Sequence, residues 1–316
     1  MNAYRYDRLN ELNFPDLVNL IKEVYNVAVN SEQLKKKYTT DCFGASYVGY
    51  IAYHHETNQA AAYYGILPLR VRLNGRIIMA AQSGDTMTHP DHRNKGLFVA
   101  LAKQTYELGQ SLGIQFVFGF PNQNSYPGLV RKLGWTHAYD MLSVNLLVPT
   151  LPYAKFLIKK PKLAAWHSKS LMNLLKKFFV CPTVLPQKLL SAHMHEEGVV
   201  HDQNFFDYKL GYDCICLQHK EVFIILKVEN NNLGIGTILN YGKPADVKVA
   251  LRKLKFVCFL MGIIRIKTYC SPDKLASTFL HKYGFSKKSL SYCYINFNAE
   301  ADLHALHFTY LDYDTF

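Results

Sequence analysis

The alternation of apolar and polar positions over the first 90 residues predicts a helix followed by three strands. A helix is expected at 15–26, because Leu17 and its apolar neighbours recur at helical spacing. Apolar runs at 47–54 and 60–71 are separated by a polar segment, as in a hairpin. Asn74-Gly75 favours a two-residue turn into a third strand at 76–88. The three strands should form an antiparallel meander.

A strand, a turn and a helix follow one another in the next segment. Leucines at helical spacing predict a helix at 97–112, and Gly113 suits its C-terminal cap. An apolar run at 114–120 predicts another strand, and a short helix is expected at 129–133. Because a strand, a helix and a strand in succession form a crossover, strands 76–88 and 114–120 should lie parallel.

The second half of the sequence repeats this order of elements. A hairpin is predicted at 222–239, then a helix at 245–261, a strand at 263–269, a helix at 275–281 and a last strand at 289–297. Leu133-Gly-Trp135 and Tyr283-Gly-Phe285 end the two matching stretches. We interpret this as an internal duplication with an α+β fold. The predicted domains are 1–150 and 201–316, joined by a basic helical connector at 151–200.

Composition limits the class of protein. With 316 residues, 49% hydrophobic and 19% charged, the chain is globular and long enough for two cores. The start of the sequence lacks the apolar core of a signal peptide, and no apolar run reaches membrane-spanning length. We therefore expect a cytoplasmic protein. The seven cysteines form no zinc pattern, so reduced, mostly buried thiols and no bound metal are expected.

The net charge of +12 favours an anionic partner. No acidic residue lies between Asp140 and Glu196, and within this segment seven lysines between 155 and 177 are interspersed with Leu, Phe and Trp. Two interpretations stay open for this segment: a connector with a solvated lysine face, which we prefer, or a basic amphipathic helix in weak contact with an anionic membrane surface.

The segment Thr88-His-Pro-Asp-His-Arg-Asn-Lys-Gly-Leu-Phe98 carries the candidate chemistry. A helix N-terminus offers free backbone N–H groups to an anion, and Gly96 lets a phosphate approach closely. Arg93 and Lys95 add positive charge, so the turn suits a pyrophosphate. The spacing is neither that of a P-loop nor that of a dinucleotide fingerprint.

This segment resembles the acyl-CoA-binding motif of the GNAT acyltransferases, Arg/Gln-x-x-Gly-x-Gly/Ala. Arg93 and Gly96 match the motif, whereas Phe98 replaces its last glycine. Lys132-Leu-Gly-Trp135 is similar to the family's Lys-Leu-Gly-Phe ending. The resemblance implies two tandem GNAT-like domains, each a mixed, mostly antiparallel twisted sheet flanked by helices. The second domain lacks the motif, and Pro244 removes an amide there, so one acyl-CoA site is expected.

By this resemblance, acyl-CoA is the co-substrate and its contacts can be assigned to residues. The pantetheine arm would be held by the strand end at 86–88 and by two asparagines, and the pyrophosphate by the turn and the start of the helix. The predicted cofactor-binding residues are Thr86, Met87, Thr88, Arg93, Asn94, Lys95, Gly96, Leu97, Phe98, Asn122 and Asn124.

Within the family, the stretch from Gln82 to Pro90 looks like that of acyltransferases acting on nucleotide-linked amino sugars, such as dTDP- or UDP-linked sugars of lipopolysaccharide, O-antigen or capsule synthesis. The predicted partners are acyl-CoA and an anionic amino-sugar nucleotide. Two alternatives stay open: another amine acceptor (an aminoglycoside, a polyamine or a protein lysine), and a basic, non-enzymatic nucleic-acid-binding protein. The sequence contains no zinc finger, RNA-recognition signature or arginine-rich tract, so no nucleic acid is expected.

Acyl transfer to an amine needs an oxyanion donor and a base. The resemblance assigns the amide of Met87 to the thioester oxygen. Asp85 is the predicted base, with a pKa raised by burial, although it could instead pin a loop. His89 is a reserve base and Tyr126 a candidate acid, and both could serve packing alone. The predicted acceptor-binding residues are Gln82, Ser83 and Asp85.

Overall fold

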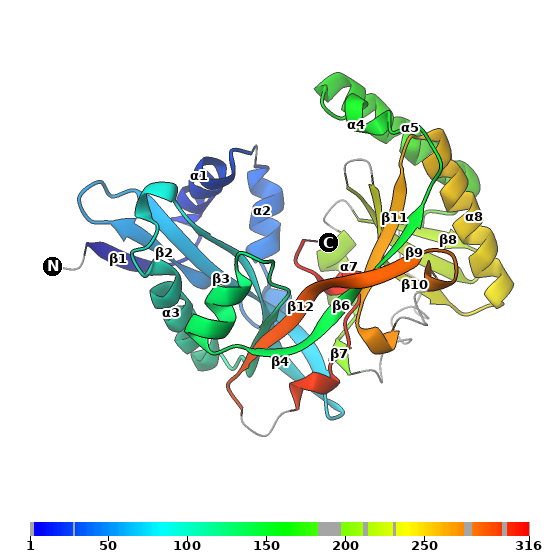
Figure 1. Cartoon of the computed structure of the whole chain (residues 1–316). Coiled ribbons are helices and arrows are strands. Elements are labelled where there is room, and N and C mark those ends of the chain that lie inside the picture. The colour runs from blue at the N-terminus through cyan, green and yellow to red at the C-terminus, as the bar shows by residue number, and fades with distance from the viewer. Residues whose placement is uncertain are drawn as a thin grey trace. The chain divides into compact units, whose positions relative to one another are not determined.

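The computed structural model describes residues 3–27, 29–182, 197–210, 214–229, 232–274, 280–298 and 302–315. The chain forms two compact units (Figure 1). Unit 1 comprises residues 1–139, 197–200 and 290–306, and unit 2 comprises residues 140–196, 201–289 and 307–316. The division into domains at 150 and 200 stays a prediction, since the units are not continuous in sequence.

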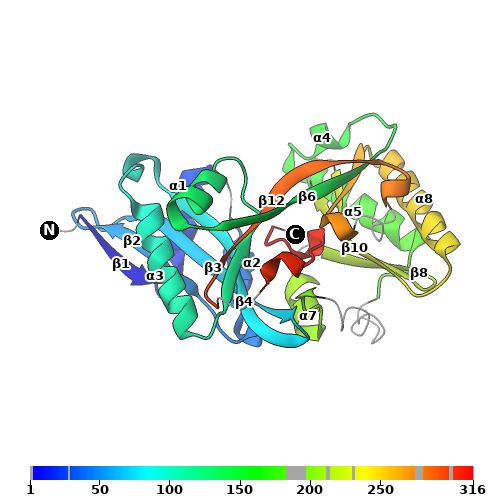
Figure 2. The same ribbon diagram turned by 60° about the horizontal axis from the view of Figure 1, so that its bottom comes forward.

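Unit 1 is built on a mixed sheet. Its strand order is β1 (Tyr4–Arg8), β2 (Val48–His54), β3 (Ala60–Leu73), β4 (Arg76–Thr88), β5 (Phe116–Gly119) and part of β12 (Phe285–Asn296). The predicted meander of β2, β3 and β4 is confirmed, and β3 with β4 forms the long hairpin coloured cyan in Figure 2. β4 and β5 are parallel, as the crossover predicted. The short β7 (Gly198–Val199) pairs with β3.

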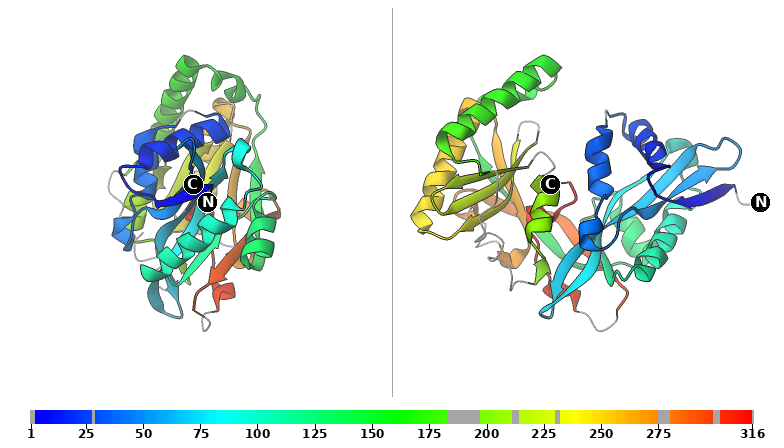
Figure 3. Two further views of the ribbon diagram at one scale, coloured as in Figure 1. Left: turned by 90° about the vertical axis from the view of Figure 1, so that its left-hand side faces the viewer. Right: turned by 180° about the vertical axis from the view of Figure 1, so that it is seen from behind.

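Helices cover both faces of this sheet (Figures 1 and 3). α3 (Leu97–Ser111) packs on one face, where its Tyr106 joins Tyr64 in a buried cluster. α1 (Phe14–Tyr25) packs on the other face, near α2 (Ser31–Tyr38), in a core that includes Tyr63 and Met87. β4 therefore lies between two cores, one on each side of the sheet.

In unit 2 the strand order is β6 (Thr136–Leu147), β11 (Arg265–Cys270), β10 (Asn232–Asn240), β9 (Val222–Glu229) and β8 (Cys214–His219). The predicted hairpin is β9 and β10, and the predicted helix is α8 (Pro244–Leu260). The other helices among the described residues of unit 2 are α4 (Ala154–Leu157), α5 (Pro161–Phe178) and α7 (Gln203–Leu210). Of the helix predicted at 275–281, residues 275–279 lie outside the described residues, and 280–282 form a 3-10 turn.

Both units contain the same crossover, and each is completed by a strand from elsewhere in the sequence. β4, α3 and β5 in unit 1 correspond to β10, α8 and β11 in unit 2, with parallel pairing in both. The strand that follows β5 in sequence, β6, pairs with β11. The strand that follows β11, β12, pairs with β5 at residues 293–296. The last strands are thus exchanged, which the sequence analysis did not foresee.

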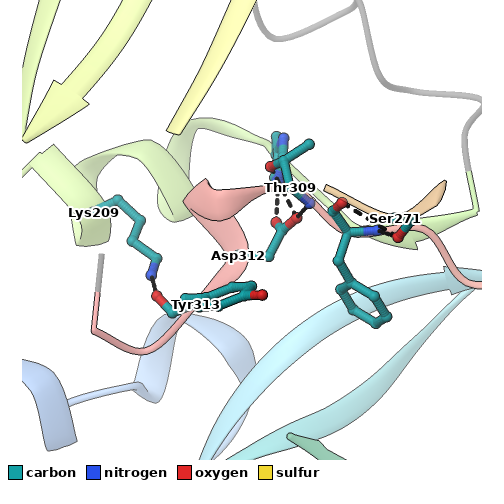
Figure 4. Close-up of polar contacts among 7 residues, drawn as sticks. Lys209, Ser271, Thr309, Asp312 and Tyr313 are labelled. Carbon is teal, nitrogen blue, oxygen red and sulfur yellow. Dashed lines mark hydrogen bonds and ion pairs between the residues drawn. The ribbon is translucent and has the colours of Figure 1, made fainter. Parts of the chain in front are cut away.

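The C-terminal segment closes the sheet of unit 2 at one point. β10 and β11 pair only as far as Gly234↔Lys267. Farther along β11, Cys270 pairs with Leu142 on one side and with Thr309 on the other. The amide of Ser271 donates to the carbonyl of Phe308 at 2.9 Å, and Asp312 accepts from the amide of Thr309 at 2.6 Å (Figure 4). Residues 308–312 therefore lie beside the end of β11 that does not pair with β10.

Several side chains have the environment that the sequence indicated. None of the seven cysteines, all of them described, forms a disulfide, and five are buried. Within the described part of the chain, no helix combines the length and the hydropathy that crossing a membrane requires.

Candidate functional site

An opening between two parallel strands defines the candidate site in unit 1. β4 pairs with β5 only at Ala81↔Val117 and Gln82↔Phe118, after which the strands diverge. On its other edge, β4 has a bulge, because Met87 faces Tyr63 and Gly84 faces Gly65, so two residues, 85 and 86, stand opposite one. Asp85 has a φ of 51°, in the left-handed region. The end of β4 thus turns away from β5.

The turn after β4 has the geometry of an anion site. Asn94 and Gly96 have φ values of 61° and 76°, both left-handed. Gly96 is the N-cap of α3, and no side chain caps the helix there, so its first N–H groups are available to a ligand. No atom lies within 4 Å of where a Cβ on Gly96 would stand. A phosphate group can therefore reach these backbone N–H groups.

The end of β4, the turn and the segment that follows β5 line one cavity of about 730 Å³. Every residue predicted to hold acyl-CoA lines it. Residues that the sequence analysis did not assign also line it: Val24, Tyr25, His92, Val99, Ser125, Pro127, Gly128, Arg131 and Lys132. The structure thus brings the predicted cofactor residues together, while their part in binding stays a prediction.

The lining of this cavity is cationic. Arg93 and Lys95 come from the turn, and Arg131 and Lys132 come from the π-helical turn η3 (Gly128–Lys132). None of the described lining residues is acidic. Sequence reasoning gave Arg131 and Lys132 no binding role, although Lys132 begins the Lys-Leu-Gly-Trp ending that it had noted. A ligand with several phosphate groups would therefore meet cationic side chains from both the turn after β4 and η3.

Phe98, which departs from the family motif, has a partner that explains it. A Cβ on Gly128 would lie only 3.0 Å from Cε1 of Phe98. The ring of Phe98 also stands edge-on to Tyr64, with centroids 5.7 Å apart. The larger side chain at position 98 is accommodated because position 128 has none. Both residues line the cavity, so this pair shapes its wall.

Asn122 and Asn124 follow β5, but they have different surroundings. The side-chain oxygen of Asn122 accepts from the amides of Asn124 at 2.9 Å and Ser125 at 3.1 Å. It therefore caps its own turn, as asparagine commonly does. This contact gives Asn122 a structural task in shaping the loop, in addition to its place in the cavity wall.

Asp85 is placed differently from the expectation of a raised pKa. Its Oδ2 lies 2.8 Å from Nζ of Lys37 and accepts a hydrogen bond from the Tyr38 hydroxyl at 2.8 Å. Burial disfavours the charged carboxylate, but Lys37 and Tyr38 outweigh it, so the pKa of Asp85 lies below its ordinary value. The expected direction was wrong because α2 supplies a cation that the sequence analysis did not place beside β4. Asp85 does not line the cavity.

Gln82 and Ser83 lie where β4 and β5 diverge, outside the cavity wall. Gln82 is buried, and its Nε2 has no hydrogen-bond partner among the described residues. Ser83 donates to the Tyr64 hydroxyl at 3.1 Å, which lies 2.7 Å from the Tyr106 hydroxyl. Burial raises the pKa of Tyr64 to about 12, so this chain of hydroxyls stays protonated at neutral pH.

The reserve catalytic residues lie outside the cavity wall as well. His89 accepts from the amide of Asp91 through Nδ1 at 3.4 Å, as the cap of a short 3-10 turn. The hydroxyl of Tyr126 lies 3.1 Å from Nδ1 of His137. A histidine that the analysis did not select, His92, lines the cavity, with Nδ1 2.9 Å from the Tyr4 hydroxyl. Burial, together with His54 and His89, lowers the pKa of His92, which keeps its imidazole neutral at pH 7.

Comparison with known proteins identifies the domain that carries this cavity. Residues 5–138 match the family model described as an acetyltransferase (GNAT) domain. A search of curated proteins finds no relative by sequence. Residues 5–138, which contain β2 to β5, nearly all of β1 and the whole cavity wall, therefore match a GNAT domain.

Solved structures share the fold of the whole chain. A GCN5-related N-acetyltransferase from Anabaena variabilis is 14% identical with a TM-score of 0.57, over 93% of this chain and 73% of that one. One from Sphaerobacter thermophilus is 14% identical with a TM-score of 0.51, over 96% and 99%. The N-myristoyltransferase of Saccharomyces cerevisiae with bound myristoyl-CoA is 10% identical with a TM-score of 0.57, over 94% and 79%. At these identities the likeness is one of fold, and it extends over both units.

Proposed function

We propose, from the premise that residues 5–138 are an acetyltransferase (GNAT) domain and the chain an acyl-CoA-dependent N-acyltransferase, that the acyl group passes to the amine of a nucleotide-linked amino sugar. One observation carries the choice of acceptor: the cavity is lined by four Arg and Lys residues and, among the described residues, by no carboxylate. Both acyl-CoA and a sugar nucleotide bring phosphates to such a site.

The lining of the cavity supports one orientation for the proposed co-substrate. The backbone N–H groups around Gly96 and the side chain of Arg93 suit the pyrophosphate of CoA. The pantetheine arm would follow the edge of β4 at Thr86–Thr88, which β5 leaves unpaired. The thioester would then lie toward the divergence of the strands, near the bulge at Asp85.

The reaction we propose is direct attack of the amine nitrogen on the thioester carbonyl carbon. The N–C bond forms, the C–S bond breaks, and CoA leaves as a thiolate that takes up a proton. The amide of Met87 would donate to the developing oxyanion. Lys37 and Tyr38 keep the carboxylate of Asp85 ionised and already engage its Oδ2, so we assign Asp85 a positioning role at the bulge. The substrate ammonium would lose its proton to water.

The same cavity argues against the alternative acceptors. A polyamine or an aminoglycoside is polycationic and would be repelled by Arg93, Lys95, Arg131 and Lys132. No feature of the cavity favours a nucleic acid over a small phosphorylated ligand. We place the reaction in the cytoplasm, as the sequence analysis expected, and by resemblance in the synthesis of a surface polysaccharide. The predicted contact with an anionic membrane concerns unit 2 and not this cavity.

Calorimetry with CoA tests the binding part of the proposal. We expect the wild type to bind CoA and Arg93→Ala to bind it at least about tenfold more weakly, because a charge-assisted contact to phosphate is lost. Arg76→Ala, an exposed arginine in the β3–β4 hairpin, is the matched control and should bind as the wild type does. Equal affinity in all three proteins would contradict the assignment of the turn.

The acceptor is tested separately, by thiol release from acetyl-CoA and longer acyl-CoAs. UDP- and dTDP-linked amino sugars would be compared with spermidine, kanamycin and a lysine peptide. We expect turnover only with the sugar nucleotides. Turnover with spermidine or kanamycin instead would overturn the acceptor while leaving the acyltransferase standing.

A further inference from the structure

A surface of unit 2, distant in sequence from the GNAT domain, combines exposed rings with positive charge. α5 and α8 lie next to one another in Figures 1 and 3, and their Phe178 and Phe256 rings are 5.9 Å apart. Leu171 of α5 and Leu254 of α8 belong to one buried cluster. Because both helices bury one side in this core, their other sides point outward from the same layer.

The outward side of α5 carries a tryptophan among lysines. The buried positions of this helix are His167, Leu171 and Leu175, spaced by one turn. Trp166 is 58% exposed. Lys162 and Lys169, both exposed, stand one turn before and after it. Trp166 therefore belongs to the lysine face and not to the core.

The outward side of α8 repeats this combination. Phe256 and Phe259 are 49% and 47% exposed, and Arg252, one turn before Phe256, is exposed as well. Leu260, next to Phe259, is exposed as well. We name the surface formed by Lys162, Trp166, Lys169, Arg252, Phe256 and Phe259 the lysine–aromatic face.

α5 carries no acidic residue, and α8 carries none beyond its first turn. From Asp140 to Glu196 the sequence has no carboxylate between those two residues, while seven lysines occur between 155 and 177. The single acid of α8, Asp246, lies at the start of the helix, 2.6 Å from Nζ of Lys220. The lysine–aromatic face thus presents large apolar side chains surrounded by cations.

We propose that this face docks the protein onto an anionic phospholipid bilayer. Lys and Arg would contact the phosphates of the headgroups, and the rings of Trp166, Phe256 and Phe259 would enter the boundary between headgroups and acyl chains. A nucleic acid would pair with the cationic side chains of this face, but it would offer no apolar environment to an exposed aliphatic side chain such as Leu260. The inference is independent of the acceptor proposed for the cavity.

Vesicle sedimentation of the full chain tests the proposal. We expect pelleting with vesicles of phosphatidylcholine and phosphatidylglycerol, none with phosphatidylcholine alone, and release at high salt. The double variant Lys162→Glu, Lys169→Glu should reduce the bound fraction at least about tenfold. The matched control is Lys103→Glu, an exposed lysine of α3, which should bind as the wild type does. Equal pelleting of both variants would overturn the proposal.

Intrinsic fluorescence gives a second, local readout. The chain has two tryptophans, and Trp135 is 3% exposed, so a change on binding reports Trp166. We expect a blue shift with anionic vesicles and its loss in Trp166→Ser. Leu12→Ser, at a residue 93% exposed in unit 1, controls for loss of any surface apolar group. An unshifted spectrum despite pelleting, or retention of an oligonucleotide at physiological salt without vesicle binding, would also overturn the proposal.

Discussion

Phe98 fills the space that Gly128 leaves open: a Cβ at position 128 would come within 3.0 Å of the ring. The two residues belong to different elements, the first turn of α3 and the turn η3, and both line the cavity. Their fit is therefore a property of the cavity wall as well as of the core.

Gly128→Ala should weaken CoA binding by roughly tenfold, because the added methyl group forces Phe98 toward the cavity at an overpacking cost of about 1–3 kcal/mol. The gain in helix propensity, about 1 kcal/mol, should keep the stability change small. Calorimetry with CoA measures the effect. Adding Phe98→Leu should restore the affinity, and a double variant as weak as the single one would refute the steric explanation.

Asp85→Asn should destabilise the protein by about 1–3 kcal/mol at pH 7, because it breaks the ion pair with Lys37 inside the bulge. Asparagine tolerates the left-handed backbone at this position, so strain is not added. The pKa of Asp85 is lower in the folded protein than in the unfolded chain, where it is about 3.9. The contribution of Asp85 to the free energy of unfolding is therefore fully present above the unfolded pKa and is lost as the pH falls through the folded pKa.

Urea unfolding of wild type and Asp85→Asn at pH 7 and at about pH 2–3 measures this difference. The two proteins should converge in acid. Asp91→Asn, an exposed acid next to the turn, is the control and should show no difference. If Asp85 were the catalytic base, Asp85→Asn would lose the fall in kcat/KM that the wild type shows at low pH. We do not expect this loss.

CoA binding should become tighter as the pH falls through the region below neutrality. His92 lines the cavity with a lowered pKa, and bound phosphate would raise that pKa again, so binding takes up a proton between the two values. Calorimetry at about pH 6.5 in two buffers of different ionisation heat measures the uptake. His92→Gln should abolish the difference between buffers, and an unchanged difference would assign the proton to another group.

Tyr106→Phe should cost about 1–3 kcal/mol of unfolding free energy. Nε1 of Trp135 donates to the Tyr106 hydroxyl at 2.8 Å within a buried site, so the variant leaves this N–H without its acceptor. Tyr283→Phe, at a 45% exposed residue of unit 2, should be neutral. Chemical denaturation of both variants decides, and equal stability would mean that water replaces the lost hydroxyl.

The sequence was most informative where local rules determine structure. Asn74-Gly75 marked the β3–β4 turn, where both residues have positive φ values. The periodic leucines marked α3, and the resemblance then selected the residues that the structure gathers around one cavity. These features depend on neighbours within one turn or one strand, which a single sequence records.

The elements that were missed lack such a pattern. α2, Ser-Glu-Gln-Leu-Lys-Lys-Lys-Tyr, is mostly polar and buries only Tyr38, so no apolar stripe announced it. The signal that existed was its cap, because Asn30 accepts from the amides of Glu32 and Gln33. Because α2 was not predicted, Lys37 could not be placed beside Asp85. The direction in which the pKa of Asp85 is shifted could therefore not be inferred.

The exchange of last strands has a consequence for how the protein is made. On the ribosome, β1 to β5 emerge together, yet β5 finds its outer neighbour only when residues 293–296 of β12 have been synthesised. Until then the apolar strand Phe-Val-Phe-Gly at 116–119 is an open edge, the kind of surface that recruits other chains. The N-terminal sheet therefore cannot be completed before β12 has been synthesised, so chaperone dependence and aggregation should be greatest for a nascent chain that is paused before β12.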